Sequence, residues 1–209
     1  MTKKTSAIGW SVLALLSVGI AGYAYHYLLP NAFVPPPIKA NPLAMPWLFV
    51  HAGLAATAML LGPFQFLQPI RTRVPILHRW MGRTYVFACL GGGFAGLLLS
   101  TGSTAGPVAR LGFGLLAVIW LITTSMAWNK AHTRRFEEHR RWMIRSFALT
   151  FAAVTLRLYM PIAAIAHLDG LTAYRAIAWL AWVPNLIVAE LYLARGRVRR
   201  VPAAMREAA

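Results

Sequence analysis

Two arginines in one long apolar segment are the residues of this chain with the clearest chemical consequence. Arg157 lies in the apolar stretch 151–160, twelve residues after Arg145, which corresponds to about 18 Å along a helix. A charged side chain at the middle of a bilayer costs between ~3 and ~15 kcal/mol. Arg157 therefore needs a partner, a water-filled cavity or a bound anion, and we expect it to point into a polar cavity inside the protein.

Such a cavity is the default binding site, and its candidate occupants are anionic or electron-rich. They are a haem propionate, a lipid phosphate, a carboxylate and a quinone carbonyl. His51 and Asn185 are expected at a depth similar to that of Arg157, toward the outer side of the membrane. Gln65, Arg83, Arg145 and Glu190 are expected toward the other side.

Glu190 is the only acidic residue within the apolar spans defined below. A buried carboxylate without a partner would stay protonated, so we expect an ion pair with Arg145 or Arg83. A salt bridge that tethers two helices and a proton or ligand site are both compatible with this pattern. We count Glu190, Asn185 and Gln65 as buried polar residues.

Histidines add haem b to the candidate cofactors, because membrane haem is commonly held by two facing imidazoles with cations near its propionates. His78 and His139 share a depth and are flanked by arginines, and His51 is a candidate on the other side. Against this, His78 and His139 lie at the headgroup boundary, where a lone histidine more often contacts lipid phosphate. With one cysteine and no His-Glu-x-x-His motif or carboxylate cluster, we predict no metal site of the usual kinds.

Composition requires a membrane around these residues. The chain has 209 residues, of which 58% are hydrophobic and 12% charged, and crossing the hydrocarbon needs about 20 apolar residues. Such runs predict an all-α protein with six transmembrane helices in a single domain, over residues 7–29, 46–68, 78–101, 107–128, 142–168 and 173–194.

The net charge of +16 follows the positive-inside rule and does not indicate nucleic-acid binding, for which no recognition module is present. With a cytoplasmic N-terminus, 17 of the 21 Lys and Arg residues fall on the cytoplasmic side. We therefore expect both termini in the cytoplasm, with basic loops that attract anionic lipid headgroups.

Two segments resemble each other within the chain. Trp80-Met-Gly-Arg-Thr-Tyr85 and Trp142-Met-Ile-Arg-Ser-Phe147 share Trp, Met and Arg at matching positions, and each follows a basic stretch with a histidine. Each segment begins a helix that runs from the cytoplasm to the exterior, and the next helix returns to the cytoplasm. The pattern predicts two hairpin repeats in parallel orientation.

These motifs, together with Gly62-Pro-Phe-Gln-Phe66 and the segment from His139 to Arg157, resemble a bacterial family of multi-pass membrane proteins, domain-of-unknown-function family 2306. The resemblance covers roughly residues 45–194. It implies a helical bundle in the bacterial cytoplasmic (inner) membrane and draws attention to His51, His78, His139, Arg145 and Arg157. The resemblance implies no particular activity.

Three functional hypotheses follow from the sequence. The leading one is a membrane redox component that binds haem b or a quinone-like ligand, with Arg83, Arg145 and Arg157 neutralising anionic groups. The second is a carrier for a small anionic solute or proton, in which Arg157 and Glu190 are the substrate and coupling groups. The third is a non-catalytic membrane scaffold. No oligomeric state or substrate is predicted.

Overall fold

The computed structural model describes residues 3–198, with side chains for 7–35 and 38–195. All regular secondary structure in this part of the chain is helical. The elements in chain order are α1 (Lys3–Tyr25), η1 (His26–Leu28), α2 (Pro36–Lys39), α3 (Ala44–Leu61), η2 (Pro63–Phe66), α4 (Gln68–Arg73), α5 (Pro75–Thr101), α6 (Pro107–His132), α7 (Phe136–Thr150), α8 (Ala152–Ile165), α9 (Gly170–Leu180) and α10 (Val183–Val198).

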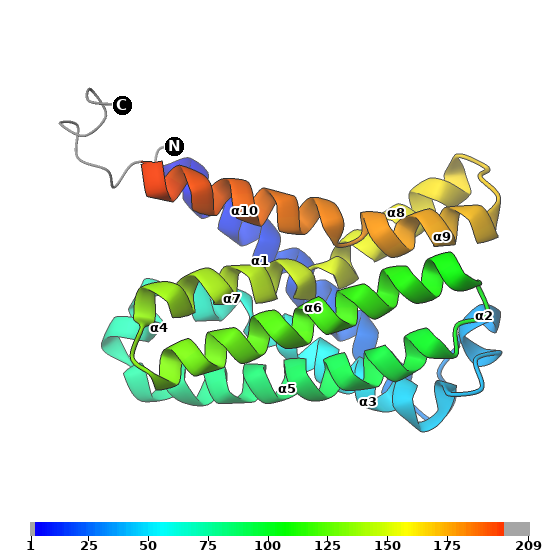
Figure 1. Ribbon diagram of the computed structural model, residues 1–209, viewed down its shortest axis with the longest axis horizontal. Coiled ribbons are helices and arrows are strands. Elements are labelled where there is room, and N and C mark those ends of the chain that lie inside the picture. The colour runs from blue at the N-terminus through cyan, green and yellow to red at the C-terminus, as the bar shows by residue number, and fades with distance from the viewer. Residues whose placement is uncertain (1–2, 199–209) are drawn as a thin grey trace.

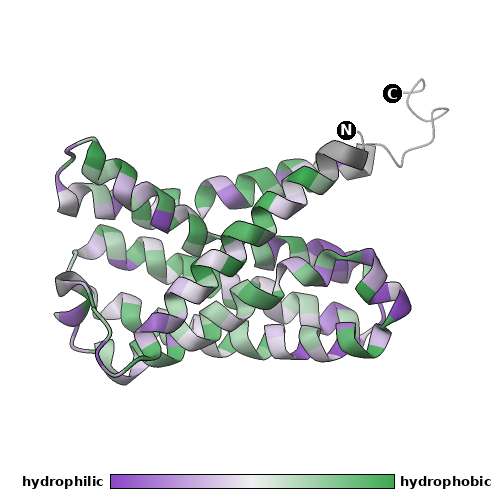
Figure 2. Cartoon of the chain, turned by 180° about the vertical axis from the view of Figure 1, so that it is seen from behind, coloured by the Kyte–Doolittle hydropathy of each residue, from purple (hydrophilic) through white to green (hydrophobic). Residues whose placement is uncertain are grey.

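The predicted all-α architecture with six membrane spans is confirmed. Within residues 3–198, six helical segments are long and apolar enough to cross a membrane: Ala7–Leu28, Ala44–Phe66, Pro75–Thr101, Pro107–His132, Phe136–Ile165 and Gly170–Arg195. Hydrophobic residues extend along the helices, while hydrophilic ones gather mainly toward the ends (Figure 2).

The fifth and sixth spans are each divided into two helices, which the hydropathy pattern does not reveal. Pro184 sits at the start of α10, and because its nitrogen has no hydrogen it cannot continue the hydrogen bonding of α9. The division between α7 and α8 falls at Phe151, between Thr150 and Thr155. Each of these threonines donates its hydroxyl to the carbonyl four residues earlier, a bond that bends helices.

Local sequence signals mark where several helices begin. Pro75 and Pro107 open α5 and α6, positions at which a missing N–H costs nothing. Asp169 caps α9 by accepting the backbone N–H of Thr172 at 2.8 Å, and this hydrogen bond lowers the pKa of its carboxyl group. The last hairpin therefore turns at a defined residue.

The helices α3, α5, α6 and α7 pack in that order into the centre of the bundle, and α1 packs on α3 (Figure 1). The pair α8–α9 contacts α6 through α9, and α10 returns along α7. Small side chains such as Ala58, Ala88, Ala127 and Ala181 are almost fully buried at these contacts. Small residues allow membrane helices to approach closely.

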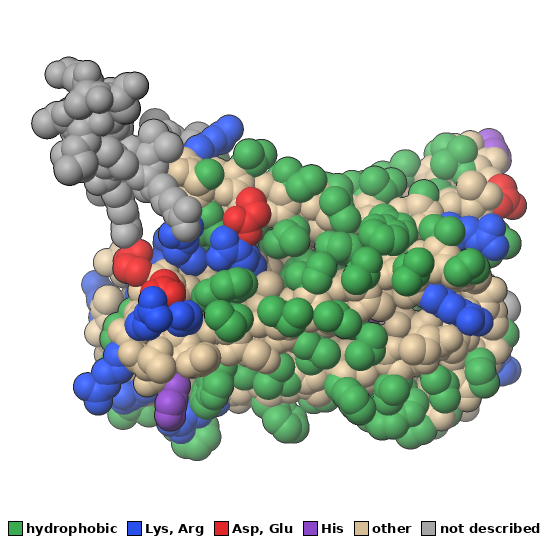
Figure 3. All heavy atoms as spheres, in the orientation of Figure 1, with side chains coloured by type: hydrophobic (Ala, Val, Ile, Leu, Met, Phe, Trp, Pro, Cys, Tyr) green, Lys and Arg blue, Asp and Glu red, His purple; other side chains and the backbone are tan. Residues whose placement is uncertain are grey.

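Charge is distributed unevenly between the two ends of the bundle. α1 begins and α10 ends at the same end, where α4 and the α6–α7 turn also lie (Figure 1). Lys and Arg side chains gather there, and green apolar side chains cover most of the length between the ends (Figure 3). We call this the basic end; the tail residues 199–209, part of the predicted cytoplasmic charge, lie outside the described residues.

The two copies of the repeated segment share a local geometry. The guanidinium carbon of Arg83 lies 5.1 Å from the ring centroid of Trp80, and that of Arg145 lies 4.7 Å from that of Trp142. In each copy the arginine therefore folds back onto the tryptophan one helical turn before it, a cation–π contact. The matching letters of the sequence thus correspond to matching side-chain arrangements.

Candidate functional site

A cavity of about 720 Å³ lies in the half of the bundle away from the basic end. All six spans contribute to its wall, for example through Ile20, His51, Gly96, Trp120, Arg157 and Tyr174. Most lining residues are apolar, with a few polar side chains among them. This is the usual composition of a site for a small amphipathic molecule.

Arg157 lies on the wall of this cavity, but the cavity is largely apolar, whereas the sequence predicts a polar one. Its Nη1 donates to the carbonyl of Ala153 at 3.0 Å, and its guanidinium carbon lies 5.5 Å from the ring centroid of Tyr23. These contacts use only part of a group that carries five N–H donors. Pro161 also lines the cavity, and because it lacks an N–H it leaves the carbonyl of Arg157 without its usual helical partner.

His51 lines the same cavity from α3. Its Nδ1 lies 2.8 Å from the carbonyl oxygen of Gly92 on α5. Because a carbonyl only accepts, Nδ1 must carry the proton and Nε2 of the neutral ring is left as an acceptor. Gly96, one turn further along α5, makes room for the ring, since a Cβ there would lie 3.0 Å from Nδ1.

The Gly92-xxx-Gly96 pattern therefore does more than bring two helices together. Gly92 lets α5 approach the backbone of α3, where an added Cβ would lie 3.3 Å from the nitrogen of Ala55. Gly96 accommodates the imidazole, and the carbonyl of Gly92 orients it. The two glycines thus fix both the position and the tautomer of His51.

Aromatic residues on the cavity wall escaped the sequence analysis. Tyr23 and Tyr27 from the first span, Trp120 from α6 and Tyr174 from α9 all line it. The rings of Tyr23, His26 and Tyr27 also contact one another in tilted or edge-to-face arrangements, with centroid distances between 4.1 and 6.2 Å. A cluster of aromatic residues at the end of a span is a common interfacial anchor, so the sequence alone gave no reason to assign it to a site.

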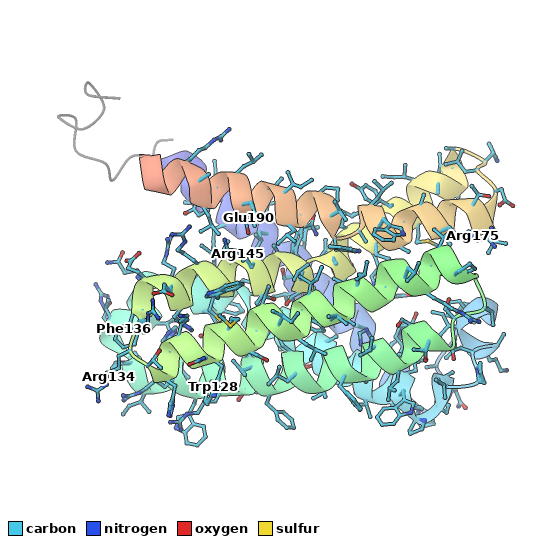
Figure 4. The ribbon with its side chains drawn as sticks, viewed as in Figure 1. Trp128, Arg134, Phe136, Arg145, Arg175 and Glu190 are labelled. Atoms are coloured by element: carbon cyan, nitrogen blue, oxygen red, sulfur yellow. The ribbon has the colours of Figure 1, made fainter. Side chains whose placement is uncertain are left out.

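Glu190 forms the expected ion pair with Arg145. Arg145 Nη2 donates to Oε2 at 2.8 Å, and Nε donates to Oε1. Figure 4 shows the two side chains pointing toward one another from α10 and α7. The prediction that Glu190 is buried is wrong, because 48% of its side chain is exposed at the surface of α10. Its neighbours Ile187, Val188 and Leu191 on α10 are exposed as well. Neither Arg145 nor Glu190 lines the cavity, so the pair lies away from it.

Gln65 and Asn185 do not line the cavity. Gln65 is buried in η2, as predicted, and its Nε2 has no hydrogen-bond partner. Asn185 is half-buried and donates to the carbonyls of Ala148 and Ala181 and to the hydroxyl of Thr155. It therefore bridges the break between α7 and α8 to the start of α10.

The structure keeps His78 and His139 away from the cavity, at the basic end. His139 Nδ1 lies 2.8 Å from the carbonyl of Ala127, whereas His78 Nδ1 is buried without a partner. The two rings are close enough to interact electrostatically, and His78 also interacts with Arg71. Arg83 lies one helical turn after Trp80, on the exposed side of α5.

A buried hydroxyl network joins α5, α6 and α7 below the cavity. Tyr85 Oη lies 3.0 Å from both Ser146 Oγ and Thr150 Oγ1, and Ser146 Oγ lies 2.7 Å from Thr124 Oγ1. Trp120 Nε1 donates to Thr150 at 2.9 Å. Trp120 and Thr150 also line the cavity, so the network forms its floor and holds the central helices in register.

Comparison with known proteins agrees with this description. Residues 48–193 match the model of the family described as predicted membrane protein (DUF2306), and because this is more than half of the chain, the protein belongs to that family. No curated protein and no solved structure matches the chain significantly.

Proposed function

We propose that this protein is a membrane redox component whose cavity binds a quinone-like amphiphile. The observation that carries the proposal is a largely apolar cavity with Arg157 and His51 on its wall. A quinone has the matching chemistry, because its ring is apolar and its carbonyl oxygens accept hydrogen bonds from a guanidinium. The N–H groups that Arg157 does not use within the protein would bind one such oxygen.

His51 suits the reduced form of the same ligand. Reduction adds two electrons and two protons to a quinone and converts each carbonyl into a hydroxyl. Because Nδ1 of His51 donates to Gly92, Nε2 accepts, and a quinol hydroxyl can donate to it. Arg157 and His51 therefore favour different redox forms. Two successive transfers from a one-electron carrier at the membrane surface would supply the electrons, and water would supply the two protons.

Haem b held by two imidazoles does not fit this cavity. Among the described residues that line it, His51 is the single histidine, and His78 and His139 belong to the basic end. A bis-histidine site needs two rings facing each other at one depth. The quinone hypothesis needs one acceptor nitrogen and one cation, which the wall provides.

The carrier hypothesis requires Arg157 and Glu190 to act on one substrate. Glu190 on α10 is instead paired with Arg145 on α7, away from the cavity. We therefore prefer the quinone-binding hypothesis to the carrier hypothesis. The proposal includes a bacterial cytoplasmic membrane with both termini in the cytoplasm, because the basic end carries most of the described cations.

Binding of a short-chain ubiquinone to the purified protein in phosphatidylcholine nanodiscs tests the proposal. Trp120 lines the cavity, so quenching of tryptophan fluorescence reports occupancy. Losing a charge-assisted hydrogen bond costs about 1.5–3 kcal/mol, so Arg157→Gln is expected to weaken binding by at least tenfold. Lys39→Gln, which removes an exposed cation at the same end, is the control.

Four results would contradict the proposal. Equal affinity of folded Arg157→Gln and wild-type protein would remove the site, and failure of a one-electron reductant at the membrane surface to reduce the bound quinone would remove the redox role. A Soret band in protein produced with ample haem would favour haem instead. Competition by inorganic phosphate or phosphatidate would identify an anion site rather than a quinone site.

A further inference from the structure

We infer that the ligand reaches the cavity sideways from the bilayer, between α1 and α8, and that Tyr23 controls this opening. The inference rests on the proposed function and deepens it. It assigns the ligand to amphiphiles that are dissolved in the membrane and keep their apolar tail there while the head is bound.

Four residues line the cavity and are also exposed on the outside of the protein. One is Thr104 in the loop between α5 and α6, and the other three lie in α1 and α8 and locate the opening. They are Tyr23 of α1, with 52% of its surface exposed, Met160 of α8, with 40% exposed, and Pro161, also exposed. All three belong to segments expected to cross the membrane. An opening between them therefore faces lipid rather than water.

Beyond the apolar packing of Ala21 against Val154, Tyr23 and Arg157 close this gap between α1 and α8. The guanidinium carbon of Arg157 lies 5.5 Å from the ring centroid of Tyr23. Beside it, α1 presents the small side chains of Ala21 and Ala24 to the cavity. Rotation of one tyrosine side chain would therefore widen the gap without breaking a hydrogen bond between α1 and the bundle core. The same movement would free the guanidinium for the ligand head.

The end of the cavity near the loops is fastened more firmly. Asn41 donates to the carbonyl of Leu99 at 2.8 Å and accepts the backbone N–H of Leu43 at the same distance. Arg175 Nε donates to the carbonyl of Ala105 at 2.7 Å. A water-soluble ligand arriving from this end would have to break several such bonds, so the lipid-facing side is the easier route.

The wall formed by α1 also lies outside the part of the chain that defines the family. The family model begins at residue 48, whereas Tyr23 and Tyr27 belong to the first span. The cation and the histidine therefore come from the shared core, and the side wall comes from a separate segment. We assign the choice of ligand head to Arg157 and His51, and the choice of tail and access to Tyr23.

Association kinetics in nanodiscs test this inference with two quinones, one without a tail and one with a long isoprenoid tail. We expect the long-tailed quinone to bind, and its association rate to follow its mole fraction in the bilayer at constant aqueous volume. Tyr23→Ala should raise both the association and the dissociation rates severalfold, with a smaller change in affinity. Tyr23→Phe keeps the ring over Arg157 and should behave like the wild type.

The outcomes separate this inference from the proposed function. No saturable binding of either quinone would refute the proposed function itself. Binding of the tail-free quinone only, or rates that are unchanged in Tyr23→Ala, would refute lateral access while leaving the site intact. Thermal melting of each variant shows that it is folded, and Tyr23→Leu replaces Tyr23→Ala if the alanine variant is not.

Discussion

Substitution of Gly96 by alanine tests whether His51 must be oriented for the site to work. The added Cβ would lie 3.0 Å from Nδ1 and 3.1 Å from Cε1 of His51. Comfortable contact begins near ~3.5 Å, so the ring must retreat by roughly half an ångström. The bond from Nδ1 to the carbonyl of Gly92, now 2.8 Å, would lengthen to the outer limit of hydrogen bonding.

The expected effects on stability and on binding differ. The weakened hydrogen bond costs about 1 kcal/mol, while alanine in place of glycine inside a helix gains about 1 kcal/mol. The free energy of unfolding should therefore change little. Affinity for the quinol should fall about fivefold, since a misplaced Nε2 loses most of the bond from the quinol hydroxyl, which is worth about 1 kcal/mol.

Two measurements and one control decide the outcome. Binding in nanodiscs gives the affinity, and nitrogen NMR of labelled histidine shows whether Nδ1 of His51 still carries its proton without any ligand. Gly19→Ala is the control, because a Cβ on Gly19 would meet no atom within 4 Å. If Gly96→Ala binds as tightly as Gly19→Ala and keeps the wild-type tautomer, the reasoning about His51 is wrong.

Three further predictions concern stability. Tyr85→Phe should lower the free energy of unfolding by about 1–2 kcal/mol, because two buried hydroxyls lose a partner. A double-mutant cycle with Ser146→Ala in detergent should give a coupling energy near ~0.6 kcal/mol. A coupling energy of zero would contradict the network. Asp169 has a lowered pKa in the folded protein. Its contribution to folding stability is therefore complete above its unfolded pKa of about 3.9 and is lost as the pH falls through the folded value. The melting temperature of Asp169→Asn should depend less on pH in this range, and a pH profile identical to that of the wild type would argue against the cap. Arg157→Met should leave the melting temperature unchanged or raise it, since a scaffold role would require it to fall.

The spans and their approximate limits could be predicted because long apolar runs leave few alternatives in a bilayer. The position of Arg157 was also predictable, since a guanidinium in such a run must reach a polar space or a partner. The pairing of Arg145 with Glu190 followed from shared depth. These predictions depend on local composition and on distance along one helix.

The cavity walls could not be predicted, because they depend on angles between helices. Pro184 at the start of α10 divides the last span, and Thr150 and Thr155 flank the division of the fifth span at Phe151. Hydropathy does not register either effect. Depth alone also grouped Asn185 with Arg157, although Asn185 bonds to the helix breaks instead. Depth likewise could not show that one face of α10 is uncovered, which is why Glu190 was wrongly expected to be buried.

The balance of interactions around Arg157 explains why we assign it to ligand binding rather than to architecture. Two arginines with a structural role have clear partners. Arg145 pairs with the carboxylate of Glu190, and Arg175 donates to the carbonyl of Ala105 in the α5–α6 loop. Among the described residues, Arg157 contacts a carbonyl of its own helix and one tyrosine ring, beside an apolar cavity. A group that costs free energy to bury and binds so little of the protein is typical of a site whose partner comes from outside the chain.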